Sequence, residues 1–391
     1  MIDRIFKFLS LSLAVGVVAG CSDWMQPEPI RDITKEDFNT PVISPEDEAY
    51  FASLREWKQT PGLPQIFVWF DSWSGSSNTG SESLRALPDS VTIASNWGAH
   101  GADTSKFDLS DQRKYDMDII QRVKGTKLVV TFFSRFPGEG LPKSRFPHWY
   151  NEKGEYNYKE TTAYSSDEDK VRPYIRRYAE DLYNACIEAG YDGWDWDYEP
   201  GFGMGSGLEA PFWDNQVQRR VFVEEMSYWF GPYAMDPERD RGDRPMPKKR
   251  LLMLIDGAIG FWRMGNMPVK YFDLFILQAY SGNNLESRVS DAISEITMID
   301  REAFPSEREL VKKIILTENF ESYAGTGGGF PRMSKYVHSM SKGGSQQIGG
   351  CGLYRVGFDY DKASGKWRFL EPGITEMYKI WRNSQETDTQ N

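Results

Sequence analysis

The sequence predicts a single-domain (β/α)8 barrel, an α/β fold in which eight parallel strands alternate with helices. Apolar, strand-like runs recur eight times over about 290 residues, and amphipathic or charged stretches separate them. The runs are Ile66–Phe70, Val91–Ser95, Lys127–Ser134, Tyr191–Glu199, Leu251–Asp256, Asp273–Tyr280, Lys313–Glu318 and Ile348–Tyr354. Their spacing is typical of a closed parallel barrel.

Polar or aromatic residues stand at the carboxyl ends of these runs, where such barrels build their active sites. They are Asp71, Asn96, Trp97, Ser134, Glu199, Asp256, Gln278, Tyr280, Glu318, Asn319, Tyr354 and Arg355. From this position we predict substrate contacts for Asp71, Trp97, Asn319 and Tyr354.

Helices are expected between the strands. Val171–Ala189 has helical spacing and is followed by Gly190, a residue that commonly ends helices. A second helical stretch covers Asn215–Trp229, and a short helix around Glu46–Trp57 precedes the first strand. The glycine-rich segment Gly325–Gly329 lacks the Lys-Ser/Thr of a phosphate-binding loop and is predicted to be a flexible loop.

The amino terminus has the pattern of an export signal. Arg4 and Lys7 precede the apolar stretch Phe8–Val18, which is too short to cross a bilayer comfortably, since that requires about 20 residues. The following Ala-Gly-Cys resembles a bacterial lipobox, which implies that Cys21 is lipidated and anchors the protein to a membrane. We therefore expect an outer-membrane lipoprotein exposed at the cell surface. The expected organisation is a signal peptide (1–20), a lipidated cysteine and tether with a short helix (21–60), the barrel (61–385) and a polar tail (386–391).

Composition excludes several classes of function. The formal charge of −11 argues against a nucleic-acid partner, which would require a basic surface. None of the three His residues has the spacing of a zinc-ligand pair, so no metal is expected. Cys186 and Cys351 lie in apolar patterns and are predicted to be buried free thiols.

The fourth predicted strand carries the most informative pattern in the chain. Asp195, Asp197 and Glu199 recur at every second position, so in a strand they share one face, while three aromatic residues alternate with them. Like charges this close repel one another, and a chain keeps them where chemistry requires them. A solvated acidic loop would rarely interleave aromatic residues, and a calcium loop would need a central Gly and a later acid. The pattern therefore predicts an active site.

These carboxyl groups suit glycoside cleavage. Glu199, at the open end of the strand, can protonate a glycosidic oxygen if its neighbours raise its pKa. Asp197 is too near Glu199 in sequence to act from the opposite face of a sugar, which argues against two opposed carboxylates. The remaining route uses the substrate's own 2-acetamido oxygen as the nucleophile. Asp197 would orient the acetamide, and Asp195 would share a proton or hydrogen bond with Asp197.

The run Asp192-Gly193-x-Asp195-x-Asp197-x-Glu199 resembles the DGxDxDxE motif of glycoside hydrolase family 18, which contains chitinases and endo-β-N-acetylglucosaminidases. The resemblance implies a (β/α)8 barrel with Glu199 as general acid/base, Asp197 as the acetamide-orienting residue and Asp195 as its support. Asp192 has the opposite parity in the strand, so its side chain should point to the other face. We include it among the predicted substrate contacts, with a structural role as the alternative.

The sixth strand separates the branches of this family. The family places a Tyr there that contacts the acetamide carbonyl, and Tyr280 matches it. Chitinases usually have Met-x-Tyr-Asp, whereas Gln278-Ala279-Tyr280-Ser281 resembles the endo-β-N-acetylglucosaminidase branch and makes Gln278 a substrate-binding candidate. The Trp that floors many chitinase sites on the eighth strand is absent, and Tyr354 is the candidate replacement.

The resemblance thus implies a retaining, substrate-assisted endo-β-N-acetylglucosaminidase that cleaves the β-1,4 bond in the di-N-acetylchitobiose core of N-glycans. Two alternatives remain: a chitinase or chito-oligosaccharide hydrolase with the same residues, and an inactive barrel that binds glycans at the cell surface. The expected partners are N-linked glycans of glycoproteins and a lipid membrane through Cys21. We expect a monomer with no metal or organic cofactor.

Overall fold

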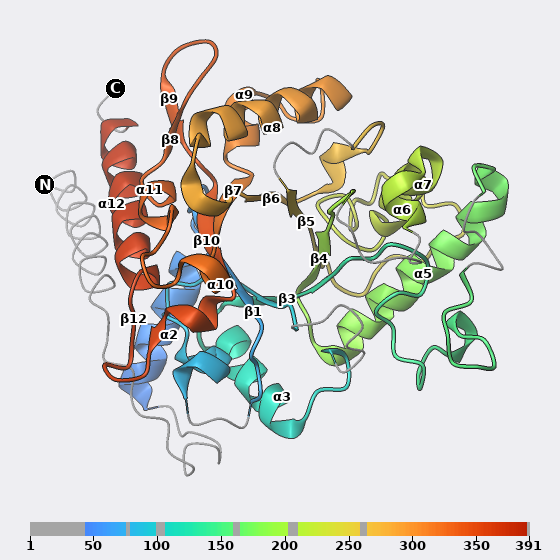
Figure 1. Cartoon of the computed structure of the whole chain (residues 1–391), viewed down its shortest axis with the longest axis horizontal. Coiled ribbons are helices and arrows are strands. Elements are labelled where there is room, and N and C mark those ends of the chain that lie inside the picture. Colours follow the sequence, from blue (N-terminus) through green and yellow to red (C-terminus); the bar gives the residue numbers. More distant parts are fainter. Residues whose placement is uncertain are drawn as a thin grey trace, which may run out of the picture.

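Eight parallel strands close into a barrel in the computed structural model, which describes residues 44–75, 79–98, 106–158, 165–201, 210–258 and 264–388 (Figure 1). The strands pair in the order β1-β10-β7-β6-β5-β4-β3-β2. They are β1 (Gln65–Phe70), β2 (Ile93–Asn96), β3 (Lys127–Phe132), β4 (Gly193–Asp197), β5 (Leu252–Ala258), β6 (Leu274–Gln278), β7 (Ile314–Asn319) and β10 (Gly350–Tyr354). Each corresponds to one of the eight predicted runs, and the predicted fold class is confirmed.

Helices surround the barrel in Figure 1. They are α2 (Pro45–Trp57), α3 (Asp111–Asp118), α5 (Glu168–Ala189), α6 (Pro211–Asp214), α7 (Gln216–Met226), α8 (Leu285–Ile299), α9 (Glu307–Val311), α10 (Phe320–Tyr323), α11 (Phe330–Met333) and α12 (Leu370–Asp388). Two small hairpins, β8 (Val337–Ser339) with β9 (Ser345–Gln347) and β11 (Tyr360–Asp361) with β12 (Lys366–Trp367), flank β10 in the chain. In the described part of the connection between β1 and β2, short 3₁₀ turns replace a full helix.

The barrel has an inner and an outer apolar core. A small cluster fills the barrel interior: Phe67, Trp69, Ile93, Val129, Leu254, Ile276 and Ile315. A much larger cluster lies between the strands and the surrounding helices. Both cysteines in the described residues, Cys186 and Cys351, are buried and free, as predicted. The inner core closes the barrel below its carboxyl end and leaves that end to polar groups.

The connection from α5 into β4 places the acidic strand. Gly190 follows α5 at φ +89°, and its N–H donates to the carbonyl groups of Cys186 and Ile187, which ends the helix. On the outer face of β4, Trp194 and Trp196 are fully buried and contact the ring of Phe222 on α7. This apolar outer face fixes which side chains of β4 point into the barrel.

Helix α2, expected within the tether, packs on the barrel. Trp57 contacts the ring of Tyr378 on α12 with centroids 4.9 Å apart, and Leu54 is 1% exposed. Arg55 and Lys58 donate hydrogen bonds to the carbonyl oxygens of Val123 and Val91. The structural unit therefore begins before residue 61, the predicted start of the barrel.

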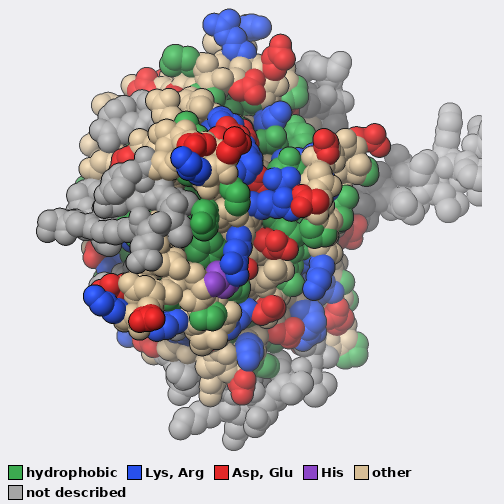
Figure 2. Space-filling view, turned by 90° about the vertical axis from the view of Figure 1, so that its right-hand side faces the viewer, with side chains coloured by type: hydrophobic (Ala, Val, Ile, Leu, Met, Phe, Trp, Pro, Cys, Tyr) green, Lys and Arg blue, Asp and Glu red, His purple; other side chains and the backbone are tan. Residues whose placement is uncertain are grey.

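The predicted signal peptide and Cys21 lie outside the described residues. Within the described ranges, no helix is both long and apolar enough to cross a membrane. Figure 2 shows acidic and basic side chains side by side on one face of the molecule, so the negative charge of the chain does not collect on that face.

Candidate active site

Two carboxyl groups of β4 point into the barrel at its carboxyl end. Asp195 is 0% and Asp197 is 5% exposed, on the face opposite the two buried Trp residues. Glu199 comes two residues after the end of β4 and is only partly buried. The alternation read from the sequence thus holds, and it orders the three groups from the deepest to the most accessible.

Asp195 is held at the bottom of this group by two donors. Its Oδ2 accepts from the indole N–H of Trp69 at 3.0 Å and from the hydroxyl of Thr131 at 2.8 Å. Thr131 in turn contacts the hydroxyl of Ser95. These donors stabilise a negative charge. Asp195 therefore has the strongest hydrogen-bond support among the buried carboxyl groups of the site.

Asp256 is a fourth carboxyl group of the cluster. The sequence placed it at a strand end without assigning it a role. In the β4–β5 register it stands opposite Asp197, and it is 1% exposed. Asp195, Asp197 and Asp256 are thus three buried carboxyl groups on two adjacent strands, and carboxyl groups this close titrate as a coupled unit.

Burial and mutual repulsion shift the pKa values of these groups upward. Burial raises the pKa of Asp195 to about 6, against the opposing hydrogen bonds from Thr131 and Trp69. Burial, and then the charges of Glu199 and Asp195, hold the pKa of Asp197 well above its ordinary value. The pKa of Asp256 is raised well above its ordinary value by burial and then by Asp197 and Asp195. The folded cluster therefore holds its protons to higher pH than free carboxyl groups would.

Glu199 is linked to the cluster through Gln278 of β6. The amide Nε2 of Gln278 donates to Glu199 Oε1 at 2.7 Å and to Asp256 Oδ1 at 3.0 Å. Burial raises the pKa of Glu199, and the hydrogen bond from Gln278 partly opposes that shift. A partly accessible acid with a raised pKa can donate a proton near neutral pH.

Tyr280 lies close to the same carboxyl groups. Burial, and then the charges of Asp256, Asp197 and Glu199, raise the pKa of its hydroxyl well above the ordinary value. The phenol therefore stays protonated and can donate a hydrogen bond to a substrate.

Aromatic rings form a floor beside the carboxyl groups. The ring of Tyr354 lies near those of Trp69, Trp97 and Tyr280, with centroids 6.1, 5.1 and 6.2 Å away. The indole N–H of Trp97 also points to Asp197 Oδ2 at 3.5 Å. The structure thus brings Trp97, Tyr354, Gln278 and Tyr280 together with the strand-four acids.

Asp71 and Asn319 stand at the same end of the barrel, with their side chains engaged by the protein. Asp71 Oδ2 accepts from Arg355 Nε at 2.7 Å, which ties the end of β1 to the end of β10. Asn319 caps α10 by accepting from the N–H of Ser322. Each residue therefore already has a partner within the protein.

Asp192 lies away from this group, which corrects its prediction as a substrate contact. It precedes β4, at the opposite end of the strand from Asp197, and accepts from Lys249, Gln121 and the N–H of Leu128. These bonds connect β4 to its neighbours at the base of the barrel. Its role is structural, in agreement with its parity in the motif.

Strained backbone conformations mark the active-site end of the barrel. Among the described residues, the non-glycine residues at positive φ are Ser134, Ser281, Asn284 and Arg355. All four lie in connections that follow the carboxyl ends of β3, β6 and β10. Such strain persists only where the surrounding structure enforces it, and it concentrates at functional sites.

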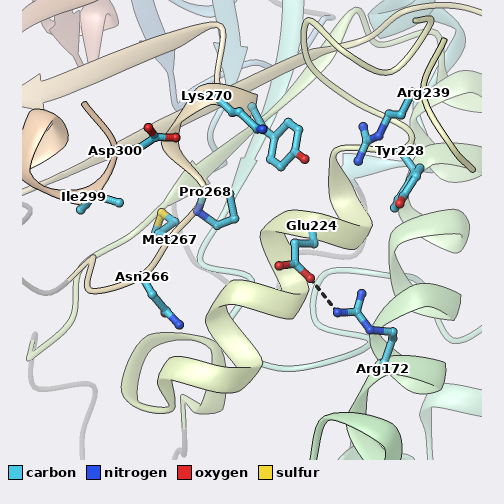
Figure 3. A pocket seen from close by; sticks show the side chains of 11 residues that line it. Arg172, Glu224, Tyr228, Arg239, Asn266, Met267, Pro268, Lys270, Ile299 and Asp300 are labelled. Atoms are coloured by element: carbon cyan, nitrogen blue, oxygen red, sulfur yellow. Dashed lines mark hydrogen bonds and ion pairs between the residues drawn. The ribbon is translucent and has the colours of Figure 1, made fainter. Parts of the chain in front are cut away.

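A separate cavity of about 440 Å³ lies outside the barrel, between α5, α7 and the segment before β6 (Figure 3). Its arginines have partners within the protein: Arg172 pairs with Glu224, and Arg239 donates to the carbonyl oxygen and hydroxyl of Ser227. None of the strand-four carboxyl groups lines it. This cavity is therefore distinct from the candidate active site.

The geometry above agrees with comparisons with known proteins. A model of the family described as glycoside hydrolase family 18, BT1044-like, matches residues 31–375. The chain belongs to glycoside hydrolase family 18. A search of curated proteins finds no match.

Solved structures of similar fold include a selenomethionine structure of BT1044 with a Glu-to-Gln substitution. It has a TM-score of 0.58 and 25% identity, over 90% of this chain and 97% of that chain. Another is an endo-β-N-acetylglucosaminidase from Cordyceps militaris, in complex with fucosyl-N-acetylglucosamine-Asn. It has a TM-score of 0.53 and 15% identity, over 84% of this chain and 95% of that chain. Membership of this family supports a glycosidase.

Proposed function

We propose that this family 18 protein is a retaining, substrate-assisted endo-β-N-acetylglucosaminidase that cleaves between the two N-acetylglucosamines of the N-glycan core. The observation that carries the proposal is the bridge made by Gln278, whose amide contacts both Glu199 and Asp256. This bridge connects the acid of strand four to the Gln-x-Tyr sequence of strand six, which distinguishes the chain from the usual chitinase pattern.

Glu199 carries the proton in the first step. It gives this proton to the glycosidic oxygen while the acetamide carbonyl oxygen of the substrate attacks C1. The C1–O bond breaks, the second N-acetylglucosamine leaves as an alcohol, and an oxazolinium forms. The Glu199 carboxylate then removes a proton from water, which attacks C1 and reopens the ring. Two inversions at C1 give net retention, and Glu199 recovers its proton.

Asp197 and Tyr280 orient the acetamide in this proposal. Asp197 accepts the hydrogen bond of the acetamide N–H and stabilises the positive charge of the oxazolinium, and the Tyr280 hydroxyl donates to the carbonyl oxygen. Asp195 precedes Asp197 by two residues on the same face of β4, and Asp256 stands opposite Asp197 in the β4–β5 register, so both are placed to support it. Asp197 and Glu199 come from one strand, so the acetamide supplies the nucleophile that an opposed carboxylate would otherwise provide.

Two known structures support the assignment of substrate and residues. The Cordyceps enzyme is described with a fucosylated N-acetylglucosamine attached to Asn, which is the remnant of a cleaved N-glycan core. That protein carries Asp-to-Asn and Glu-to-Gln substitutions two positions apart, the spacing of Asp197 and Glu199 here. The BT1044 structure also carries a Glu-to-Gln substitution.

Parallel incubation of the protein with an N-glycosylated glycoprotein and with chito-oligosaccharides tests the proposal. Mass spectrometry should find intact glycans that end in one reducing N-acetylglucosamine, and the other N-acetylglucosamine should remain on the asparagine. Rapid depolymerisation of chito-oligosaccharides with an untouched glycoprotein would instead indicate a chitinase. Binding of glycans with no cleavage of either substrate would indicate a glycan-binding barrel.

A further inference from the structure

Glu318 of β7 is a buried carboxylate that the proposed reaction does not use. It is 0% exposed, and its Oε1 accepts from the backbone N–H groups of Ser281 and Asn319, each at 2.8 Å. Its Oε2 accepts from the N–H of Gly329. The carboxyl group of Glu318 thus accepts hydrogen bonds from backbone N–H groups of three segments.

One of these segments is the turn that carries Tyr280. Ser281 has φ 70° and ψ −9°, a left-handed conformation that strains a non-glycine residue. Glu318 binds the N–H of Ser281, and Arg332 of α11 donates to its carbonyl oxygen at 3.1 Å. The two peptide groups that flank Ser281 are therefore each held by a side chain, the first by Glu318 and the second by Arg332.

The end of the glycine-rich segment, Gly327–Gly329, is closely packed and Gly329 meets this turn, whereas Gly325 is exposed; the flexible loop predicted for Gly325–Gly329 does not describe its packed end. A Cβ on Gly329 would lie 2.3 Å from the Cα of Gly282, and one on Gly328 would lie 2.6 Å from Glu318 Oε2. Distances below 3.0 Å do not occur for real Cβ atoms. Glycine is required here because two backbone segments meet directly.

We propose that Glu318 and the segment Gly327–Gly329 form a brace that positions Tyr280 toward the acetamide of the substrate. The inference rests on the proposed function, since Glu318 would align the Tyr280 hydroxyl, which donates to the acetamide oxygen that acts as the nucleophile. Glu318 is a positioning residue because it acts through the Tyr280 turn. An error of about 1 Å in a positioned group can lower a rate about 10²-fold.

A double-mutant cycle between Glu318→Gln and Tyr280→Phe tests the brace. Gln keeps one acceptor oxygen but replaces the other with a donor, so one backbone N–H loses its partner. In the native background, Glu318→Gln should lower kcat at least about 10-fold with little change in KM. In the Tyr280→Phe background, the same change should cost less than about 2-fold, because the group being positioned is already gone. Equal losses in the two backgrounds would overturn the brace.

Hydrogen exchange gives a second readout that needs no activity. In Glu318→Gln, peptides covering residues 279–283 and 327–330 should exchange faster than in the native protein, and unchanged exchange there would also overturn the brace. Asp116→Asn is the matched control: Asp116 is a buried carboxylate that accepts from the N–H groups of Leu84 and Arg85. It should lower stability with equal effects in both Tyr280 backgrounds.

Two further variants cover the case in which Glu318→Gln does not fold. Gly329→Ala should reproduce its kcat loss, whereas Gly325→Ala, whose Cβ meets no atom within 4 Å, should leave kcat unchanged. A native protein that cleaves no 2-acetamido glycoside would refute the proposed function, and the hydrogen-exchange result would then decide the brace alone.

Discussion

Each carboxyl group of the active site has a different environment, and that difference separates the chemical roles. The Oδ2 atom of Asp195 accepts hydrogen bonds from two donors. Three other buried carboxyl oxygens of the cluster have no hydrogen-bond donor among the described residues: Asp195 Oδ1, Asp197 Oδ1 and Asp256 Oδ2. Glu199 is partly accessible and has the single amide donor of Gln278. Only Glu199 combines a raised pKa with access to a substrate, so it is the group that exchanges protons with it.

Replacing Glu199 tests this assignment directly. Glu199→Gln keeps the shape and removes the acid, so kcat on a 2-acetamido glycoside should fall by at least about 10²–10⁴-fold. Its melting temperature should hold or rise, because one crowded carboxyl group becomes neutral. Steady-state kinetics and thermal unfolding measure both effects, with the exposed Glu238→Gln as the control. Near-native activity in purified Glu199→Gln would sink the assignment.

Asp197 has a more selective effect. Asp197→Asn removes the carboxylate that orients the acetamide N–H, so kcat should fall far more than KM rises. A preformed sugar oxazoline bypasses the impaired step, and the variant should still transfer glycan from it to an N-acetylglucosamine acceptor. Product analysis by mass spectrometry measures the transfer. A covalent glycosyl ester trapped on any carboxylate of the chain would refute the mechanism.

The pH dependence of stability should reveal the protons held by the cluster. The pKa of Asp256 is raised on folding, so the folded state binds more protons than the unfolded state, in which Asp has a pKa of about 3.9. The stability of the native protein therefore falls as pH rises above about 4, by up to about 1.4 kcal/mol per pH unit for each retained proton. Asp256→Asn should escape this loss, so its melting temperature relative to the native protein should increase between pH 4 and pH 7. A constant difference over that range would contradict the raised pKa of Asp256.

At the scale of elements, the spacing of apolar residues predicted the strands, a long helix and the face of β4 that points into the barrel. The eight strands and the helix Val171–Ala189 followed from apolar spacing, and the inward face of β4 followed from its alternating aromatic residues. Periodicity could not show the partner of a polar side chain. Asp256 and Glu318 each lie near the carboxyl end of a strand. The strand register places Asp256 in the acid cluster, and the folded connection after β6 places the Tyr280 turn on Glu318.

The junction between α5 and β4 gives a prediction about an element. Gly190 has φ +89°, and a Cβ there would lie 3.3 Å from the sulfur of Met117. Gly190→Ala should therefore lower the free energy of unfolding by about 1 kcal/mol or more, with kcat unchanged because the turn lies at the base of the barrel. Urea unfolding measures the loss. Gly343→Ala, at φ +91° with no atom near its Cβ, separates the backbone cost from the contact with Met117. An unchanged urea midpoint in Gly190→Ala would show that the left-handed cap is dispensable.

At the scale of the whole molecule, two helices far apart in the sequence pack together on the outside of the barrel. Helix α2 near the beginning of the described chain packs on α12 at its end, through the contact of Trp57 with Tyr378 (Figure 1). A helix expected in the tether thus packs on the outside of the barrel.

Truncation distinguishes this arrangement from a tether that merely precedes the barrel. A chain that begins at residue 44 keeps α2 and should melt at the same temperature as the longer protein, with equal kcat. A chain that begins at residue 61 loses the buried Leu54 and also Trp57, which contacts Tyr378 of α12, and each large buried side chain is worth about 1.5–3 kcal/mol. It should melt several degrees lower or aggregate. Thermal unfolding of the two chains measures the difference. Equal melting temperatures would mean that α2 adds nothing to the barrel and that the structural unit begins at the first strand.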